Sequence, residues 1–113
     1  MDVYEQRRAE TLILRPTGRL DSISSQDLQS ELSRRISEGD TSIVLDFKDL
    51  EYISSAGLRV LLLAGKELKA RDGQLALCTL NNSVREVFEI SGFISLFPVY
   101  ATIDDAIDMP SGR

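Results

Sequence analysis

The sequence predicts a single α/β domain whose sheet is mixed but mostly parallel, with about five strands and about four helices. The chain has 113 residues, which suits one compact domain over residues 1–113. Apolar residues make up 42% of it, enough for one core. Strand-like and helix-like segments follow one another in the order β-β-α-β-α-β-α-β-α. Such alternation is typical of parallel strands joined by helices.

The first two strands are expected to form an antiparallel pair. The run VYEQRRAETLILRPTG contains two extended segments with a polar turn near residues 8–10. The second segment, residues 12–15, is closed by Pro16 and Gly18. Because the turn is so short, only antiparallel pairing is open to these strands.

The next segment, GRLDSISSQDLQSELSRRISEG, predicts a loop followed by an amphipathic helix that ends at Gly39. One face of this helix is apolar at a spacing of four residues, through Leu28, Leu32 and Ile36. The serines before and within its first turn are candidate caps: Ser22, Ser24 and Ser25.

A buried strand and a long helix form the centre of the sequence. TSIVLDF is a short, β-branched apolar run, typical of a strand covered on both faces. The following segment, LEYISSAGLRVLLLAGKEL, should enter a helix from about Ser55 to Ala70 that stops before Gly73. The buried face of this helix is predicted to hold Leu58, Leu61, Leu62, Gly65 and Leu68, with Leu63 toward the polar side.

The remaining elements are shorter. QLALCTL predicts a strand that places Cys78 in the core, and NSVREVFEISG predicts a short helix. LFPVY is expected to be a last short strand. TIDDAIDM is expected to be a final helix with Thr102 as its N-cap and two aspartates in its first turn.

Composition excludes several classes of function. The net charge of −5 argues against nucleic acid or anionic lipid as a direct partner, because both need a basic face. The longest apolar run, residues 60–64, is far short of the roughly 18 residues that span a bilayer. One cysteine and an N-terminus without an apolar core favour a cytoplasmic location.

The chain contains no histidine, which excludes a Ser-His-Asp triad and a histidine-based metal site. Its glycines match neither a Walker nor a dinucleotide-binding spacing. We therefore expect no metal and no cofactor. A small hydrolase with Ser55 as nucleophile is disfavoured for the same reasons.

Two adjacent serines, Ser54 and Ser55, stand where the long helix begins. One interpretation is helix capping, for which serine is among the best residues. One serine is enough for that role, however, and the other is spare. The second interpretation is that one hydroxyl accepts a phosphate, since the dipole and free N–H groups of a helix N-terminus stabilise a negative charge. Binding sites of open α/β sheets lie at this strand edge.

Four segments of the chain resemble the STAS domain of bacterial anti-sigma factor antagonists: TGRLD at 17–21, IVLDFKDLEYISSAGLRVLL at 43–62, VREVFEISGF at 84–93 and LFPVYATIDDAI at 96–107. The resemblance covers nearly the whole chain, and the central block is its specific part. It implies a regulatory protein that is not an enzyme. In that family an anti-sigma factor, itself a serine kinase, phosphorylates a serine at the start of the helix after the third strand.

The resemblance also implies how the switch operates. The unphosphorylated antagonist binds the anti-sigma factor and frees a sigma factor, the phosphorylated form lets go, and a serine phosphatase resets it. The expected partners are therefore an anti-sigma factor/serine kinase and a serine phosphatase, with the free protein a monomer or weak dimer. The alternative is a STAS subunit of another assembly, such as a lipid-transport or stress-signalling complex, that acts as an interaction module without phosphorylation.

The family motif is roughly Asp-Ser-[Ser/Thr/Ala]-Gly-Leu, and Gly57 with Leu58 sets the register here. Ser55 then falls on the phosphoacceptor, and Ser54 stands where the family has aspartate, which leaves Ser54 as the second choice. The partner-binding surface implied by the resemblance comprises Asp21, Ser22, Asp46, Ser54, Ser55, Ala56, Gly57 and Arg59. For Asp21 and Asp46 a loop or capping role is the alternative, and for Arg59 a solvated surface charge.

Overall fold

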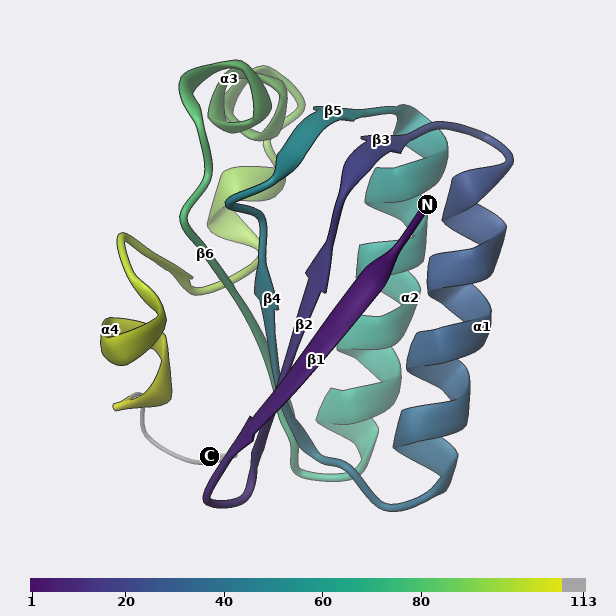
Figure 1. Cartoon of the computed structure of the whole chain (residues 1–113), viewed down its shortest axis with the longest axis vertical. Helices are drawn as coiled ribbons and strands as arrows, with labels where there is room; N and C mark the ends of the chain where they lie inside the picture. Colours follow the sequence, from purple (N-terminus) through teal and green to yellow (C-terminus); the bar gives the residue numbers. More distant parts are fainter. Residues whose placement is uncertain (109–113) are drawn as a thin grey trace.

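The computed structural model describes residues 1–108, which form a five-stranded sheet, a small second sheet and four α-helices (Figure 1). The main sheet has the order β1-β2-β4-β6-β7 and is built from β1 (Val3–Arg8), β2 (Thr11–Pro16), β4 (Ser42–Asp46), β6 (Gln74–Cys78) and β7 (Val99–Tyr100). β1 and β2 are antiparallel and the other neighbours are parallel. The predicted mixed sheet with an N-terminal antiparallel pair is therefore confirmed.

Two long helices, α1 (Ser24–Ser37) and α2 (Ser55–Ala70), lie side by side on one face of this sheet (Figure 1). The short helix α4 (Ile103–Ile107) packs on the opposite face, against β4, β6 and β7. Its predicted cap is confirmed, because the Thr102 Oγ1 accepts a hydrogen bond from the Asp105 N–H at 3.1 Å. Met109, the last residue of the predicted helical segment, lies outside the described residues.

The central strands are buried on both faces because helices cover both. Leu12 and Leu14 face the large core beneath α1 and α2, whereas Ile13 between them faces α4. Cys78 belongs to the smaller cluster under α4, as predicted for a core residue. Burial raises the pKa of its thiol to about 11, so the thiol is neutral and contributes to packing.

Helix α3 (Asn82–Ile90) sits at the end of the sheet against β5 and is followed by a single 3₁₀ turn, η1 (Phe93–Ser95). Asn81 begins α3 and ties it to β5. Its Oδ1 accepts from the Val84 N–H, and its Nδ2 donates to the carbonyl of Leu50, both at 2.8 Å. One side chain thus joins the start of a helix to a strand 31 residues earlier.

The second sheet is a parallel pair of β3 (Gly18–Leu20) with β5 (Leu50–Ile53), and it was not predicted. Both strands are very short, and the burial along β5 runs buried, exposed, exposed, buried, so the period-two alternation is missing. The two strands lead to the edge where α1 and α2 begin (Figure 1) and so position the candidate site.

Helix α2 begins and ends at the predicted residues, but its buried face is wider than predicted. Leu58, Leu61 and Leu68 are buried as expected, whereas Leu62 and Gly65 are only partly covered. The additional buried residues are Gly57 at the helix start and Val60 and Ala64, which line one narrow gap together with Leu32 and Ile36 of α1. Helix α1 thus covers a second side of α2. The apolar spacing in the sequence predicts only the side that faces the sheet.

Candidate phosphorylation and partner-binding site

The N-termini of α1 and α2 lie at the same edge of the fold, beyond the ends of β3 and β5 (Figure 1). Leu20 pairs with Ile53 across the two short strands. Immediately after this pair, the Ser54 N–H donates to the carbonyl of Leu20 at 2.8 Å. The loops that enter the two helices are therefore held next to each other by backbone hydrogen bonds.

Ser54 is the N-cap of α2. Its backbone is extended, with φ −92° and ψ 173°, and its Oγ accepts a hydrogen bond from the Gly57 N–H at 3.3 Å. The side chain is half-buried. Of the two adjacent serine hydroxyls, that of Ser54 therefore caps the helix.

Ser55 is the first residue of α2, and its side chain is exposed. Within residues 1–108, no group forms a hydrogen bond with its hydroxyl. The first N–H groups of a helix lack partners inside the helix and concentrate its positive dipole there. The Ser55 hydroxyl is therefore accessible, unengaged and placed where an added anion is favoured.

Gly57 allows α2 to approach the two short strands closely. A Cβ at this position would lie 2.8 Å from Cγ1 of Ile53 and 3.2 Å from Cβ of Leu20. The first distance is too short for a real contact, so a side chain here would require the Ile53 side chain or the start of the helix to shift. Gly57 is itself buried, and it acts by setting the height of the helix start above β3 and β5.

The cap of α1 differs from the predicted one. Asp21, rather than a serine, supplies it: one carboxylate oxygen accepts from the Ile23 N–H at 3.0 Å and from the Ser24 N–H at 2.9 Å. The hydrogen bond from the Ser24 backbone is the largest of the effects that lower the pKa of the Asp21 carboxyl. Ser24 donates its own hydroxyl to the carbonyl of Arg19 at 2.6 Å. The predicted serine cap was wrong, whereas the capping role left open for Asp21 is confirmed, because its carboxylate accepts from two N–H groups at once.

The other two candidate serines of this loop do not cap the helix. Ser25 is 2% exposed, and its hydroxyl has no hydrogen-bond partner among the described residues. Ser22 is exposed and remains available at the surface.

Asp46 lies below the surface, with 2% of its area exposed. Its Oδ1 accepts a hydrogen bond from the Lys48 N–H at 3.0 Å and so shapes the turn that leads to β5. This is the turn role left open as its alternative. The burial takes the side chain out of direct reach of a partner, so we omit Asp46 from the proposed contact surface.

Arg59 is exposed one turn after Ser55, and it forms no ion pair with any residue in 1–108. Sequence reasoning missed two exposed apolar side chains nearby, Ile23 with 76% and Tyr52 with 38% exposure. The guanidinium of Arg19 lies 4.2 Å from the centre of the Tyr52 ring. The exposure of Ile23 could have been predicted, because it is an isolated isoleucine within the polar run DSISS.

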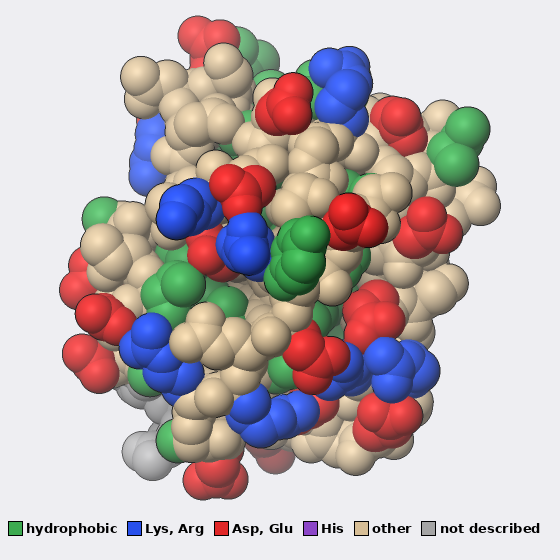
Figure 2. All heavy atoms as spheres, in the orientation of Figure 1, with side chains coloured by type: hydrophobic (Ala, Val, Ile, Leu, Met, Phe, Trp, Pro, Cys, Tyr) green, Lys and Arg blue, Asp and Glu red, His purple; other side chains and the backbone are tan. Residues whose placement is uncertain are grey.

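Charges of both signs are interspersed on the face seen in Figure 2, over β1 and α1. Ion pairs join β1 to α1 and to the loop after it: Glu5 with Arg35, and Arg7 with Asp40. This face thus carries no extended basic field. The described helices include none with the length and hydropathy that crossing a bilayer requires, and residues 1–108 contain no cluster of three potential metal ligands.

Comparison with known proteins identifies the family. Residues 1–106 match the STAS domain. The chain belongs to the STAS domain family. Its relatives include BtrV of Bordetella bronchiseptica, named as a candidate anti-sigma factor antagonist, which is 51% identical over 82 residues, covering 73% of this chain and 71% of BtrV. An anti-sigma F factor antagonist of Paenibacillus polymyxa is 31% identical over 101 residues, covering 88% and 86% of the two chains.

Solved STAS structures confirm the fold. The anti-sigma factor antagonist SpoIIAA superposes in its unphosphorylated form with a TM-score of 0.73 at 27% identity, covering 95% of this chain and 96% of SpoIIAA. The phosphorylated form from Bacillus gives 0.74 at 28% identity, with 95% and 97% coverage. The resemblance to STAS anti-sigma factor antagonists is therefore confirmed at the level of family and fold.

Proposed function

We propose that this STAS protein is an anti-sigma factor antagonist that binds an anti-sigma factor with serine kinase activity and is released when Ser55 is phosphorylated. The observation that carries the proposal is the division of roles between two adjacent serines. Ser54 caps α2 with its hydroxyl, whereas the hydroxyl of Ser55 is exposed and unengaged. A kinase can reach Ser55 without dismantling the start of the helix.

The relatives support the regulatory class of this proposal. Those named above are anti-sigma factor antagonists or candidates for that role, and one of them, SpoIIAA, has solved structures of both its unphosphorylated and phosphorylated forms. The present fold resembles the two forms almost equally, with TM-scores of 0.73 and 0.74. A phosphorylated state that keeps the STAS fold is thus represented among the relatives.

The proposed switch is electrostatic. Phosphorylation adds roughly −1.5 to −2 charge at neutral pH. In the free protein, solvent and the N-terminus of α2 accommodate this charge. In a complex that docks around a neutral hydroxyl, the same charge would be buried without a partner, which costs several kcal/mol and is enough to abolish a micromolar contact.

The proposed contact surface consists of the exposed or half-exposed residues around this hydroxyl, namely Asp21, Ser22, Ile23, Tyr52, Ser54, Ser55, Ala56 and Arg59. Gly57 supports this surface from beneath. A serine phosphatase would restore the binding-competent form. The protein is on this proposal a substrate and not an enzyme, and it acts in the cytoplasm as a monomer or weak dimer.

The test is to incubate the protein with ATP and each candidate anti-sigma kinase of its genome, and to map the phosphate by mass spectrometry. Ser55→Ala should abolish phosphorylation. Ser54→Ala is the matched control and should keep most of it, because it removes only the cap. Phosphate found mainly on Ser54, or no phosphate with any kinase while binding persists, would contradict the proposal and favour an interaction module without phosphorylation.

A further inference from the structure

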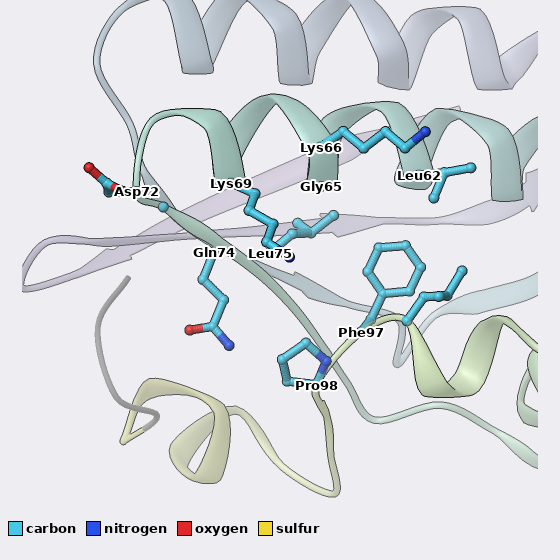
Figure 3. Close-up of a pocket in the computed structure, with 11 residues that line it drawn as sticks. Leu62, Gly65, Lys66, Lys69, Asp72, Gln74, Leu75, Phe97 and Pro98 are labelled. Atoms are coloured by element: carbon cyan, nitrogen blue, oxygen red, sulfur yellow. The ribbon is translucent and has the colours of Figure 1, made fainter. Parts of the chain in front are cut away.

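A hollow of about 610 Å³ lies at the other end of α2, between the C-terminal half of that helix and the segment that leads from η1 into β7 (Figure 3). This volume is within the range of pockets that bind small molecules, about 300–1,000 Å³. Along the helix, the pocket begins roughly 10–15 Å from Ser55, at 1.5 Å per residue. It is therefore separate from the site proposed above.

The floor of the hollow is apolar. It includes Leu75 and Phe97, which are almost fully buried in the protein, and Leu62, which is partly covered. Leu96 also lines it and is 54% exposed. Gly65 allows the Phe97 ring to lie close to the helix, since a Cβ there would be 3.2 Å from the ring.

Two lysines, Lys66 and Lys69, stand on the helix at the rim of this floor. Lys66 extends along α2 toward Leu62, and Lys69 extends toward Leu75 (Figure 3). Neither ammonium group forms an ion pair within the described part of the chain. The ion pairs found there use arginines: Arg7, Arg8, Arg15, Arg34, Arg35 and Arg71.

The remaining polar groups of the hollow do not neutralise the positive charge of the two lysines. Asp72 lines the same hollow but points away from the other labelled side chains (Figure 3), and Gln74 is neutral. Two unpaired cations therefore border an apolar cavity in a protein whose net charge is −5. A ligand that matches both features has an apolar body and an anionic head.

We propose that this hollow binds a small amphipathic anion, with the apolar part against Leu62, Leu75 and Phe97 and a carboxylate between Lys66 and Lys69. Charge complementarity favours an anion over a neutral apolar molecule, because each lysine gains a partner that residues 1–108 do not provide. The proposal does not depend on phosphorylation of Ser55.

The test uses decanoate as the probe and decanol as the matched neutral control. Decanoate titrated into the ¹⁵N-labelled protein should shift the amide signals around Leu62, Gly65, Leu75 and Phe97 in a saturable way. The Lys66→Gln/Lys69→Gln double variant should weaken binding by about five- to tenfold, from the middle of the range for two exposed ion pairs. Lys48→Gln removes an exposed lysine elsewhere and should leave binding unchanged.

Three results would overturn the proposal. Decanol binding as tightly as decanoate would mean that the hollow selects only for apolarity. Shifts that do not saturate, or that the double lysine variant does not weaken, would mean non-specific association. If the same signals move when the protein is concentrated without decanoate, a second copy of the chain occupies the hollow, and the assignment of a small anion is wrong.

Discussion

Helices α1 and α2 lie side by side and begin at the same edge of the fold, yet their N-termini differ in charge and in accessibility. At α1, the Asp21 carboxylate accepts hydrogen bonds from two backbone N–H groups. The N-terminus of this helix is therefore already paired with a negative charge of the chain itself. At α2, the cap is the neutral hydroxyl of Ser54, and the next residue presents a free hydroxyl to solvent. The comparison shows that one helix start is electrostatically complete, while the other retains room for an added anion.

The largest effect expected from this difference concerns partner binding. Ser55→Asp should weaken binding to the anti-sigma factor by about tenfold or more, because the interface would bury an unpaired charge, whereas Ser55→Ala should bind like the unmodified protein. Isothermal calorimetry measures both. Ser33→Asp adds the same charge on the exposed side of α1 and is the control that should leave affinity unchanged. Equal affinity of the two Ser55 variants would rule out the electrostatic switch.

The close approach of α2 to the short strands predicts the next effect. Gly57→Ala should lower the free energy of unfolding by about 1–3 kcal/mol, because the new methyl group overlaps Ile53 and requires that side chain or the helix start to shift. Urea unfolding measures the change. Gly65→Ala is the matched control in the same helix, where the methyl meets only the edge of the Phe97 ring and gains helix propensity. If both variants lose the same stability, tight packing at Gly57 is not the cause.

The two caps should differ in their dependence on pH. The folded state lowers the pKa of Asp21, so the stability that its ionised form contributes is complete above the unfolded value near pH 4 and is lost as the pH falls through the lower folded value. The difference in stability between the protein and Asp21→Asn should therefore shrink in acid. Ser54→Ala should cost about 0.5–2 kcal/mol at every pH. Unfolding series between pH 2 and 7, values chosen to bracket these titrations, test both, and a pH-independent effect of Asp21→Asn would contradict the charged cap.

The smallest effect is expected on stability when Ser55 itself is phosphorylated. The interaction of the phosphate with the N-terminus of α2 stabilises the folded state by on the order of 1 kcal/mol. Repulsion between the phosphate and the net charge of −5 opposes this stabilisation. The melting temperature should shift by only a few degrees, either way. Circular dichroism of the modified and unmodified proteins measures it. A drop of about 15 degrees, several times what 1 kcal/mol produces, or a loss of helical signal would mean that phosphorylation disorders α2 and acts through folding.

Much of this fold could be predicted because its long elements carry strong periodic signals. Helix α2 begins at Ser55 and ends at Ala70, as expected from its apolar spacing and the serines before it. The strands β3 and β5 could not be predicted in this way, since three or four residues are too few to show a period. Their pairing is decided by tertiary contacts beneath α2.

Most residues of the candidate site could be predicted from the sequence, but their arrangement could not. The sequence contains two adjacent serines, but only the backbone geometry at the start of α2 shows that Ser54 caps the helix and Ser55 does not. The burial of Asp46 could not be predicted either. The sequence pattern is the same whether an aspartate at the end of a strand faces solvent or binds a turn. Assignment of Ser55 as phosphoacceptor stays a prediction that rests on motif register, exposure and an unengaged hydroxyl.

The side chain of Asn81 has a consequence for how the molecule opens. Because it caps α3 and also holds the carbonyl of Leu50, separation of α3 from the sheet removes a hydrogen bond from β5, the strand that leads into Ser54. Local unfolding proceeds in contiguous cooperative units. In amide hydrogen exchange, α3 and the loop before α2 should therefore belong to one opening unit, while the central strands remain protected. The rigidity of the loop before Ser55, the proposed phosphoacceptor, is in this sense set by the N-cap residue of a different helix.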